Sequence, residues 1–331
     1  MNNIFIKTAL VLLSIAAITS CTKESSDEFV TYTNNPINDT VWANSDNNNA
    51  SLYKIIIPQL ITPTVVDSFN CLVDNTLTFG DSLQVFFGAS SCTNGNGTTI
   101  TSGGKIKIEI NLLKQKGDFI KYGLSTTNVF SLLEAGNLID IKLSQDGQEI
   151  FLHPNSQIKV KIKDSIFNNN MKFFAGSFIK YNKDTVFAWL PSVDGKVSIW
   201  KDNTVANKSL GYEIATNKLR WIGTAYYTDS LQAKTRLNVT LPLNYTNKNT
   251  AVFAVFKNKK TVINLLGDAS TKTFYTLNIP VNTEVTLVSV TKIENNFYLG
   301  TKAVKVINGD AFSLLPEKKT TAQIAEFLEK L

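Results

Sequence analysis

The sequence predicts an all-β protein with two antiparallel β-sandwich domains, followed by a short C-terminal amphipathic helix. Residues 105–110 and 158–163 alternate β-branched side chains with charged ones. This alternation is typical of strands with one buried and one solvated face. Many short apolar runs separated by Asn, Gly and Asp follow, and helical periodicity is nearly absent before residue 320. That combination favours antiparallel sandwiches.

The first 20 residues are typical of a secretory signal. Lys7 is their only charged side chain, and the apolar run over 9–18 is interrupted only by Ser14. The run is shorter than the roughly 20 apolar residues that span a bilayer. Its length suits the apolar region of a signal peptide. We therefore expect residues 1–20 to be absent from the mature protein.

Cys21 follows Ile18, Thr19 and Ser20, and this tetrapeptide resembles the lipobox of bacterial lipoproteins. The resemblance implies cleavage before Cys21 and transfer of diacylglycerol to its thiol, so the expected partner is a lipid bilayer. Stable anchoring needs more than one acyl chain, because a single chain binds only marginally. An ordinary signal peptide with a coincidental cysteine is the alternative.

Lys23 and the acidic residues after it resemble the signal that sends some Bacteroidetes lipoproteins to the outer face of the outer membrane. A merely polar tether is the alternative. The resemblance implies an outer-membrane location and leaves open which face of that membrane holds the anchor.

Composition and charge argue against nucleic acid as a partner. The chain has 331 residues, which suits two domains of ordinary size. Removing residues 1–20 takes away only Lys7 and leaves 32 basic minus 27 acidic side chains, or +5. The cations are spread along the expected strands, without an arginine-rich arm or a basic helix.

Residues 21–50 are expected to form a disordered polar tether. They are poor in large apolar groups and rich in Asn, Ser, Thr and Asp, and a flexible chain of this length reaches roughly 30 Å. Asp39, Thr40 and Val41 resemble the Bacteroidetes O-glycosylation triplet of Asp, a hydroxyl residue and an aliphatic residue. Thr40 is therefore a candidate glycan acceptor, expected to be exposed. Similar triplets begin at Asp81, Asp164, Asp184 and Asp229.

Residues 51–192 are expected to form the first sandwich. Gly103 and Gly104 precede the alternating strand at 105–110, and a tight turn at 146–147 predicts a hairpin. With segments 125–127, 133–138 and 171–176, these motifs resemble a β-sandwich region of secreted Bacteroidetes proteins that is loosely similar to ZU5 domains. The resemblance covers roughly residues 50–190 and implies a fold and no chemistry. Some ZU5 domains cleave themselves at His-Phe-Ser, but His153 precedes Pro154 here, so that activity is not carried over.

Residues 193–315 are expected to form the second sandwich, with the boundary near Ser192. Eight or nine short strands are separated by Asn, Gly and Asp. The run at 251–256 is continuously apolar, which predicts a central strand buried on both faces.

Residues 316–331 are expected to form the C-terminal helix. Thr320 and Gln323 have the spacing of a capping box. An apolar stripe follows at Ile324, Phe327, Leu328 and Leu331. We expect this stripe to dock on the second sandwich; a helix that binds a partner is the alternative.

Cys71 and Cys92 are the two cysteines that remain if Cys21 is acylated. In an oxidising envelope they are expected to form a disulfide, which would stabilise the fold by about 3 kcal/mol. Two free buried thiols are the alternative. His153 is the only histidine and no Cys-x-x-Cys occurs, so we expect no metal site and no cofactor.

Aromatic side chains provide the candidate ligand platform. Tyr226 and Tyr227 are neighbours on an expected strand, so their side chains point to opposite faces and at least one faces outward. Together with the tryptophans they are candidates for stacking on a sugar. Core packing is the alternative for Trp42, Trp189, Trp200 and Trp221.

The sequence shows no clear catalytic constellation, and no catalytic residue is predicted. His153 could serve as a general base only with suitable neighbours. Paired carboxylates could hydrolyse a glycoside, but the available ones stand in expected turns. These are Asp184, Asp194, Asp202 and Asp229.

The sequence therefore favours a non-enzymatic outer-membrane lipoprotein that acts as a binding or scaffold module for an envelope protein or glycan. A surface polysaccharide hydrolase with two carboxylates is the first alternative. A purely structural spacer is the second.

Overall fold

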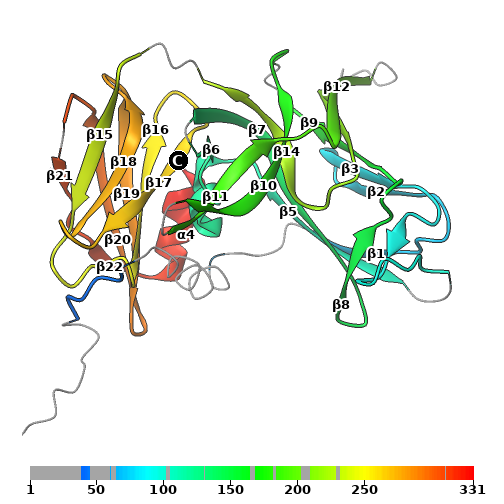
Figure 1. Cartoon of the computed structure of the whole chain (residues 1–331), viewed down its shortest axis with the longest axis horizontal. Helices are drawn as coiled ribbons and strands as arrows, with labels where there is room; N and C mark the ends of the chain where they lie inside the picture. Colours follow the sequence, from blue (N-terminus) through cyan, green and yellow to red (C-terminus); the bar gives the residue numbers. More distant parts are fainter. Residues whose placement is uncertain are drawn as a thin grey trace, which may run out of the picture. The chain divides into compact units, whose positions relative to one another are not determined.

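The computed structural model of the protein describes most of the chain after the expected tether (Figure 1). Cys21 and the expected signal peptide, residues 1–20, lie outside the described residues. The described part is mostly β, as predicted, with curled sheets and a short C-terminal helix. The described residues are 39–44, 60, 65–101, 105–129, 131–164, 168–181, 184–202, 209–228, 232–309 and 311–331.

The first sheet has nine strands, and its pairs are antiparallel. Its main path runs in the order β1 Val65–Phe69, β5 Ile106–Leu113, β7 Ser131–Gln145, β14 Arg220–Tyr227, β10 Lys172–Tyr181 and β11 Asp184–Pro191. Three short strands attach beside it, β4 Cys92–Thr93, β6 Thr127–Asn128 and β8 Gln148–Leu152.

The second sheet packs on the first through one hydrophobic cluster. Ile106, Ile108 and Ile110 of β5 are fully buried there, and Ile158 and Val160 of β9 (Ile158–Lys163) face them. The lysines between them point away, which confirms the prediction of one buried and one wet face. Its order is β12 Gly195–Asp202, β13 Ser209–Thr216, β9 Ile158–Lys163, β3 Leu83–Phe87 and β2 Asn75–Phe79.

The third sheet curls around a cluster of its own. In β16 (Thr250–Phe256), Val252 and Ala254 face this cluster, whereas Phe253 and Val255 face the opposite side. All seven residues of β16 are buried, which confirms the prediction of a strand buried on both faces. The order is β21 Ala311–Ser313, β15 Lys234–Thr240, β18 Thr273–Pro280, β17 Val262–Asp268, β16 Thr250–Phe256, β19 Glu284–Ile293, β20 Asn296–Lys305 and β22 Glu317–Lys319.

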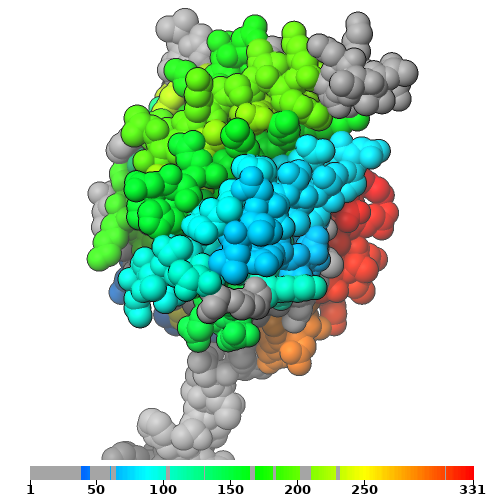
Figure 2. Space-filling model, turned by 90° about the vertical axis from the view of Figure 1, so that its right-hand side faces the viewer, coloured from blue at the N-terminus to red at the C-terminus, as the bar shows by residue number. Residues whose placement is uncertain are grey.

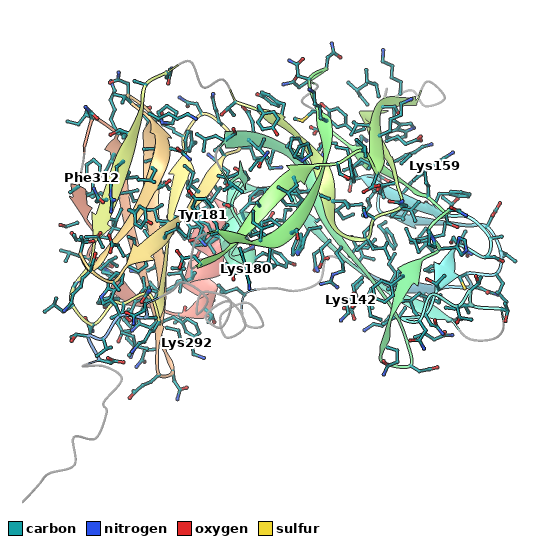
Figure 3. The ribbon with its side chains drawn as sticks, viewed as in Figure 1. Lys142, Lys159, Lys180, Tyr181, Lys292 and Phe312 are labelled. Atoms are coloured by element: carbon teal, nitrogen blue, oxygen red, sulfur yellow. The ribbon has the colours of Figure 1, made fainter. Side chains whose placement is uncertain are left out.

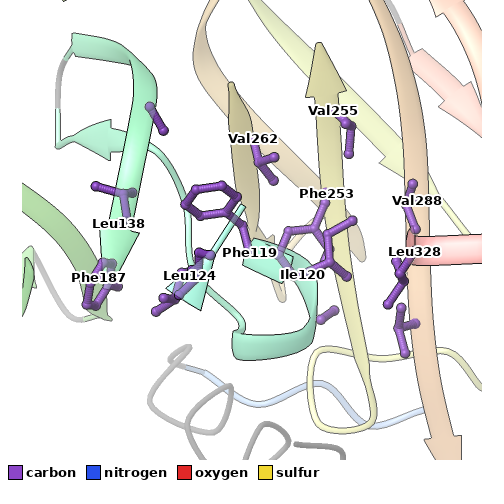
Figure 4. Packing of buried hydrophobic residues seen from close by; sticks show 14 of the residues in the cluster. Phe119, Ile120, Leu124, Leu138, Phe187, Phe253, Val255, Val262, Val288 and Leu328 are labelled. Carbon is purple, nitrogen blue, oxygen red and sulfur yellow. The ribbon is translucent and has the colours of Figure 1, made fainter. Parts of the chain in front are cut away.

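A central cluster joins the first and third sheets through two short helices, α3 Lys116–Tyr122 and α4 Thr321–Glu329 (Figure 4). Phe119 of α3, Phe253 of β16 and Leu328 of α4 are fully buried in it. The two helices are in close contact at Gly117. A Cβ atom at this position would lie only 1.8 Å from the carbonyl oxygen of Leu328, so a larger residue would not fit. We call this group of buried residues the central cluster.

The predicted C-terminal helix forms over Thr321–Glu329, a shorter span than the expected 316–331, because Glu317–Lys319 pair with β20 as strand β22. The hydroxyl of Thr320 accepts from the backbone N–H of Gln323, and the side chain of Gln323 accepts from the backbone N–H of Thr320. Ile324 and Leu328 are buried, and Phe327 packs beside them. The apolar stripe contacts α3 as well as the third sheet, so it docks on a wider surface than the expected second sandwich.

Strand pairing does not follow the expected boundary near Ser192. The hairpin of β12 and β13 extends the second sheet from β9, and β14 lies between β7 and β10 in the first sheet. The chain thus returns to both earlier sheets before it enters the third. Because these pairings join residues more than 40 positions apart, local sequence breaks do not reveal them.

Part of the expected tether packs against the third sheet. The Trp42 ring lies 5.0 Å from the Phe274 ring, between centroids. The backbone N–H of Ala43 donates to the side-chain oxygen of Asn247 at 2.8 Å, and the Asn247 amide donates to the carbonyl of Ala43 at 3.0 Å. Thr40 is half-buried in this segment.

No helix in the described ranges is long and apolar enough to cross a membrane.

Candidate functional site

An apolar groove with a cavity of about 170 Å³ lies between the first and third sheets. One wall comes from β10 and β11, and the other comes from β17 and β18. Figure 3 labels Tyr181 at the end of β10, on the first wall. The apolar side chains that line the groove are Val129, Leu132, Phe178, Tyr181, Val186, Phe187, Ile263, Leu266, Tyr275 and Leu277.

Two large apolar side chains stand open to solvent in these walls. Phe178 is 58% exposed and Leu277 is 51% exposed, one on each side of the groove. A single exposed apolar side chain is ordinary on a protein surface, but several that gather around a cavity mark an interaction site. The groove therefore offers apolar area that a ligand can bury.

The polar groups of the groove are hydroxyls and amides. Ser125, Thr127, Ser131 and Thr276 contribute hydroxyls, and Asn264 is among the amides. Each side chain in the described part of the chain that lines the groove is uncharged. Since nothing there would neutralise a buried ionic group, the groove fits an uncharged ligand.

A continuous series of aromatic rings supports the first wall from behind. The Phe178 and Phe187 centroids are 5.2 Å apart, and Phe187 is 5.2 Å from Trp189. Trp189 lies 6.5 Å from Trp221, and each pair meets edge to face, a favourable arrangement for aromatic pairs. The Trp189 indole N–H also donates to the carbonyl of Ser125 at 2.9 Å. These contacts make the wall a packed part of the core.

Tyr226 and Tyr227 lie on opposite faces of β14. Tyr227 is 41% exposed, which confirms the expectation that one of them faces outward, and its hydroxyl accepts from the Asn128 amide at 2.8 Å. The Tyr226 hydroxyl donates to Glu134 at 2.5 Å, and burial together with that carboxylate raises the pKa of Tyr226 to about 12. Neither ring lines the apolar groove.

Sequence patterns did not point to Phe178 and Leu277, because strands distant in sequence bring them together.

The candidate carboxylates that are described lie far apart. Asp184 begins β11 and Asp194 follows its end, so the strand separates them by roughly 25 Å. Asp194 is 3.3 Å from the Lys218 ammonium and accepts from the Ser192 hydroxyl, as expected for a turn. Asp229 and the side chain of Asp202 lie outside the described residues. His153 accepts a hydrogen bond from the backbone N–H of Asn155 at 3.3 Å.

Cys71 and Cys92 are both buried free thiols, so the disulfide that the sequence predicts is not present in the structure. Both pack in the cluster between the first two sheets, where a free cysteine behaves as a small apolar side chain. Burial, with a smaller contribution from neighbouring Cys71, raises the pKa of Cys92 to about 12. Neither thiol is activated as a nucleophile.

Lys260 places a cation where the first and third sheets meet. Its ammonium group donates to the carbonyl of Gly136 at 2.6 Å and to that of Leu113 at 3.4 Å. Removal from water lowers the pKa of Lys260 to about 8, although Asp164 opposes the shift. In the same region the Lys116 ammonium donates to the carbonyl of Phe256 at 2.8 Å. These lysines hold the turn between β16 and β17 against the first sheet.

Replacing Lys260 by methionine is expected to weaken the rise of stability with pH. The folded protein holds the pKa of Lys260 at about 8, below the ordinary 10.5, so the unfolded chain binds this proton more tightly. The free energy of unfolding therefore rises with pH between these two pKa values. From pH 7 to 9 the wild type should gain roughly 1 kcal/mol more than K260M in urea unfolding. Lys259→Met, at an exposed neighbour, is the control; an identical pH dependence of K260M and wild type would contradict the expectation.

No family model matches the sequence, and no curated protein matches it either. The resemblances to a lipobox and to a ZU5-like region therefore stay predictions.

Proposed function

We propose that this protein is an outer-membrane lipoprotein, anchored through acylated Cys21, that binds an uncharged apolar segment of another envelope protein in the apolar groove. The observation that carries the proposal is the placement of Phe178 and Leu277, each more than half exposed, across a cavity lined by uncharged side chains. The role is non-enzymatic, as a binding or scaffold module.

The chemistry of the groove favours a protein segment. Its apolar residues include side chains from five strands, β7, β10, β11, β17 and β18, which gives a ligand several separate points of contact. β11, which lines it, is the last strand on the main path of the first sheet. Extended peptides bind beside such strands and place alternate side chains in neighbouring pockets. An apolar segment with uncharged polar neighbours matches both features.

The envelope location rests on the sequence. The apolar run over 9–18 and the residues around Cys21 are the features of a lipidated secreted protein. The polar segment after Cys21 then separates the β-sheets from the lipid.

We further propose that the expected two sandwiches correspond to the paired first and second sheets and to the curled third sheet. Each of the two has its own hydrophobic cluster. On this division the boundary falls after Tyr227, at the end of β14, instead of near Ser192.

Leu277→Asp is expected to lower peptide affinity at least about tenfold, because a carboxylate in an apolar groove loses its hydration without gaining a partner. A phage-displayed library of linear peptides, selected on the mature chain with Cys21→Ser, supplies the ligands. We expect enriched peptides with uncharged, alternating apolar residues, and calorimetry of the best peptide measures the affinity.

Leu315→Asp is the matched control, because Leu315 is 78% exposed and lies outside the groove. It should leave the affinity unchanged. Selection of mainly charged peptides, or equal affinities for L277D and L315D, would show that the groove is not the binding site.

A further inference from the structure

The outer face of the second sheet combines basic and aromatic side chains. In β9, Ile158, Val160 and Ile162 are buried against the first sheet. Lys159 and Lys161 alternate with them and therefore point to the opposite face. Figure 3 labels Lys159 on this sheet, and Figure 2 faces the side of the molecule where the blue-to-cyan segment containing β2 and β3 lies beside the green strands.

Strand register places polar and aromatic partners beside these lysines. Glu213 of β13 and Gln84 of β3 flank Lys161, and the Glu213 carboxylate is 3.7 Å from its ammonium nitrogen. Phe86 is opposite Lys159, whose nitrogen is 6.0 Å from the ring centroid. A shallow hollow of about 240 Å³ is lined by Thr76, Gln84, Phe86, Lys159, Lys161 and Glu213.

Trp200 of β12 extends across the neighbouring strand. Its ring centroid is 5.8 Å from the ammonium nitrogen of Lys161, although their strands are separated by β13 and hence by roughly 10 Å. Gly211 stands opposite Trp200 on β13 and has no side chain. The indole therefore leans over Gly211 toward β9, which adds an aromatic surface next to the hollow.

The charge of this face is positive. Among the side chains of this face that the structure describes, Lys159, Lys161 and Lys163 of β9 and Lys196 of β12 carry four positive charges, against one negative charge on Glu213. An anionic ligand is favoured by such an excess, and the lysines can pair with its charged groups. The face differs in this respect from the apolar groove, whose lining is uncharged.

We propose that this face binds an acidic polysaccharide. Aromatic rings offer flat apolar area for the C–H faces of sugar rings, the lysines pair with carboxylate or sulfate groups, and Glu213 and Gln84 accept hydrogen bonds from hydroxyl groups. The carboxylate of Glu213 lies in the middle of the face. It repels a polymer that carries a phosphate on every unit and has no hydroxyl group nearby to donate a hydrogen bond. A sugar chain with spaced charges has hydroxyl groups to offer Glu213. The site is on a different sheet from the apolar groove and is independent of it.

Affinity electrophoresis of the mature protein through gels containing polygalacturonate tests the proposal, with the fully methyl-esterified polymer as the neutral probe. We expect retardation by the acidic polymer and little by the ester. Retardation should weaken between about 50 and 300 mM NaCl, because screening shortens the reach of the charges. Trp200→Ala should lower the affinity about three- to tenfold, and the double variant Lys159→Gln, Lys161→Gln should do the same.

Lys302→Gln is the matched control, because Lys302 also lies beside an aromatic ring, 5.8 Å from that of Phe312, but on the third sheet. It should bind like wild type, and thermal melting of each variant checks that it is folded. Four results would overturn the proposal: no retardation by polygalacturonate, equal retardation by the ester, wild-type affinity in folded W200A, or tighter binding of single-stranded DNA or phosphatidylserine vesicles.

Discussion

Replacing Cys21 by serine is expected to abolish acylation and to remove the protein from the outer-membrane fraction. A hydroxyl does not replace the thiol that accepts diacylglycerol in the lipobox reaction. Without acyl chains the protein loses about 0.8 kcal/mol of membrane affinity for each CH₂ group that would have been buried. Metabolic labelling with an alkynyl palmitate, followed by membrane fractionation, measures both effects.

Cys71→Ala is the matched control, because it removes a cysteine that is buried in the core. The C71A protein should keep its label and its membrane location. Palmitate label on the C21S protein would show that another residue carries the lipid and that the lipobox assignment is wrong.

Replacing Phe253 by alanine is expected to lower the free energy of unfolding by about 4 kcal/mol. Phe253 is fully buried in the central cluster, where β16 meets α3 and α4. Truncation removes apolar area that the surrounding residues cannot replace and leaves a cavity. Urea unfolding followed by circular dichroism measures the loss.

Phe178→Ala is the matched control for this truncation. Its ring is 58% exposed, so the same change should cost well under half as much. Equal losses of stability in the two variants would show that the central cluster does not hold the sheets together.

Local patterns predicted the elements whose burial depends on their own sequence. The isoleucines of β5 and β9 alternate with charges, and one face of each strand is buried as expected. The apolar run of β16 predicted burial on both faces, and Thr320 with Gln323 predicted the start of α4. In each case the spacing of side chains within one element decides which face is buried.

Features that depend on distant pairing escaped prediction. β14 has an ordinary strand pattern, yet it inserts between β7 and β10 of the first sheet, so the boundary expected near Ser192 does not match the strand order. Phe178 and Leu277 are nearly 100 residues apart, and only the packing of two sheets makes them opposite walls. The cysteine count and the expected oxidising envelope predicted a disulfide, whereas the structure contains two buried thiols.

The series of aromatic rings behind the groove connects the groove wall to a buried tryptophan, whose fluorescence depends on its surroundings. Phe187 touches Phe178 in the groove wall on one side and the indole of Trp189 on the other. A ligand that presses on Phe178 changes the surroundings of a tryptophan that has no contact with solvent. We therefore expect a ligand that occupies the groove to change the intrinsic fluorescence of Trp189, which can be measured without attaching a dye to a surface that a partner needs to reach.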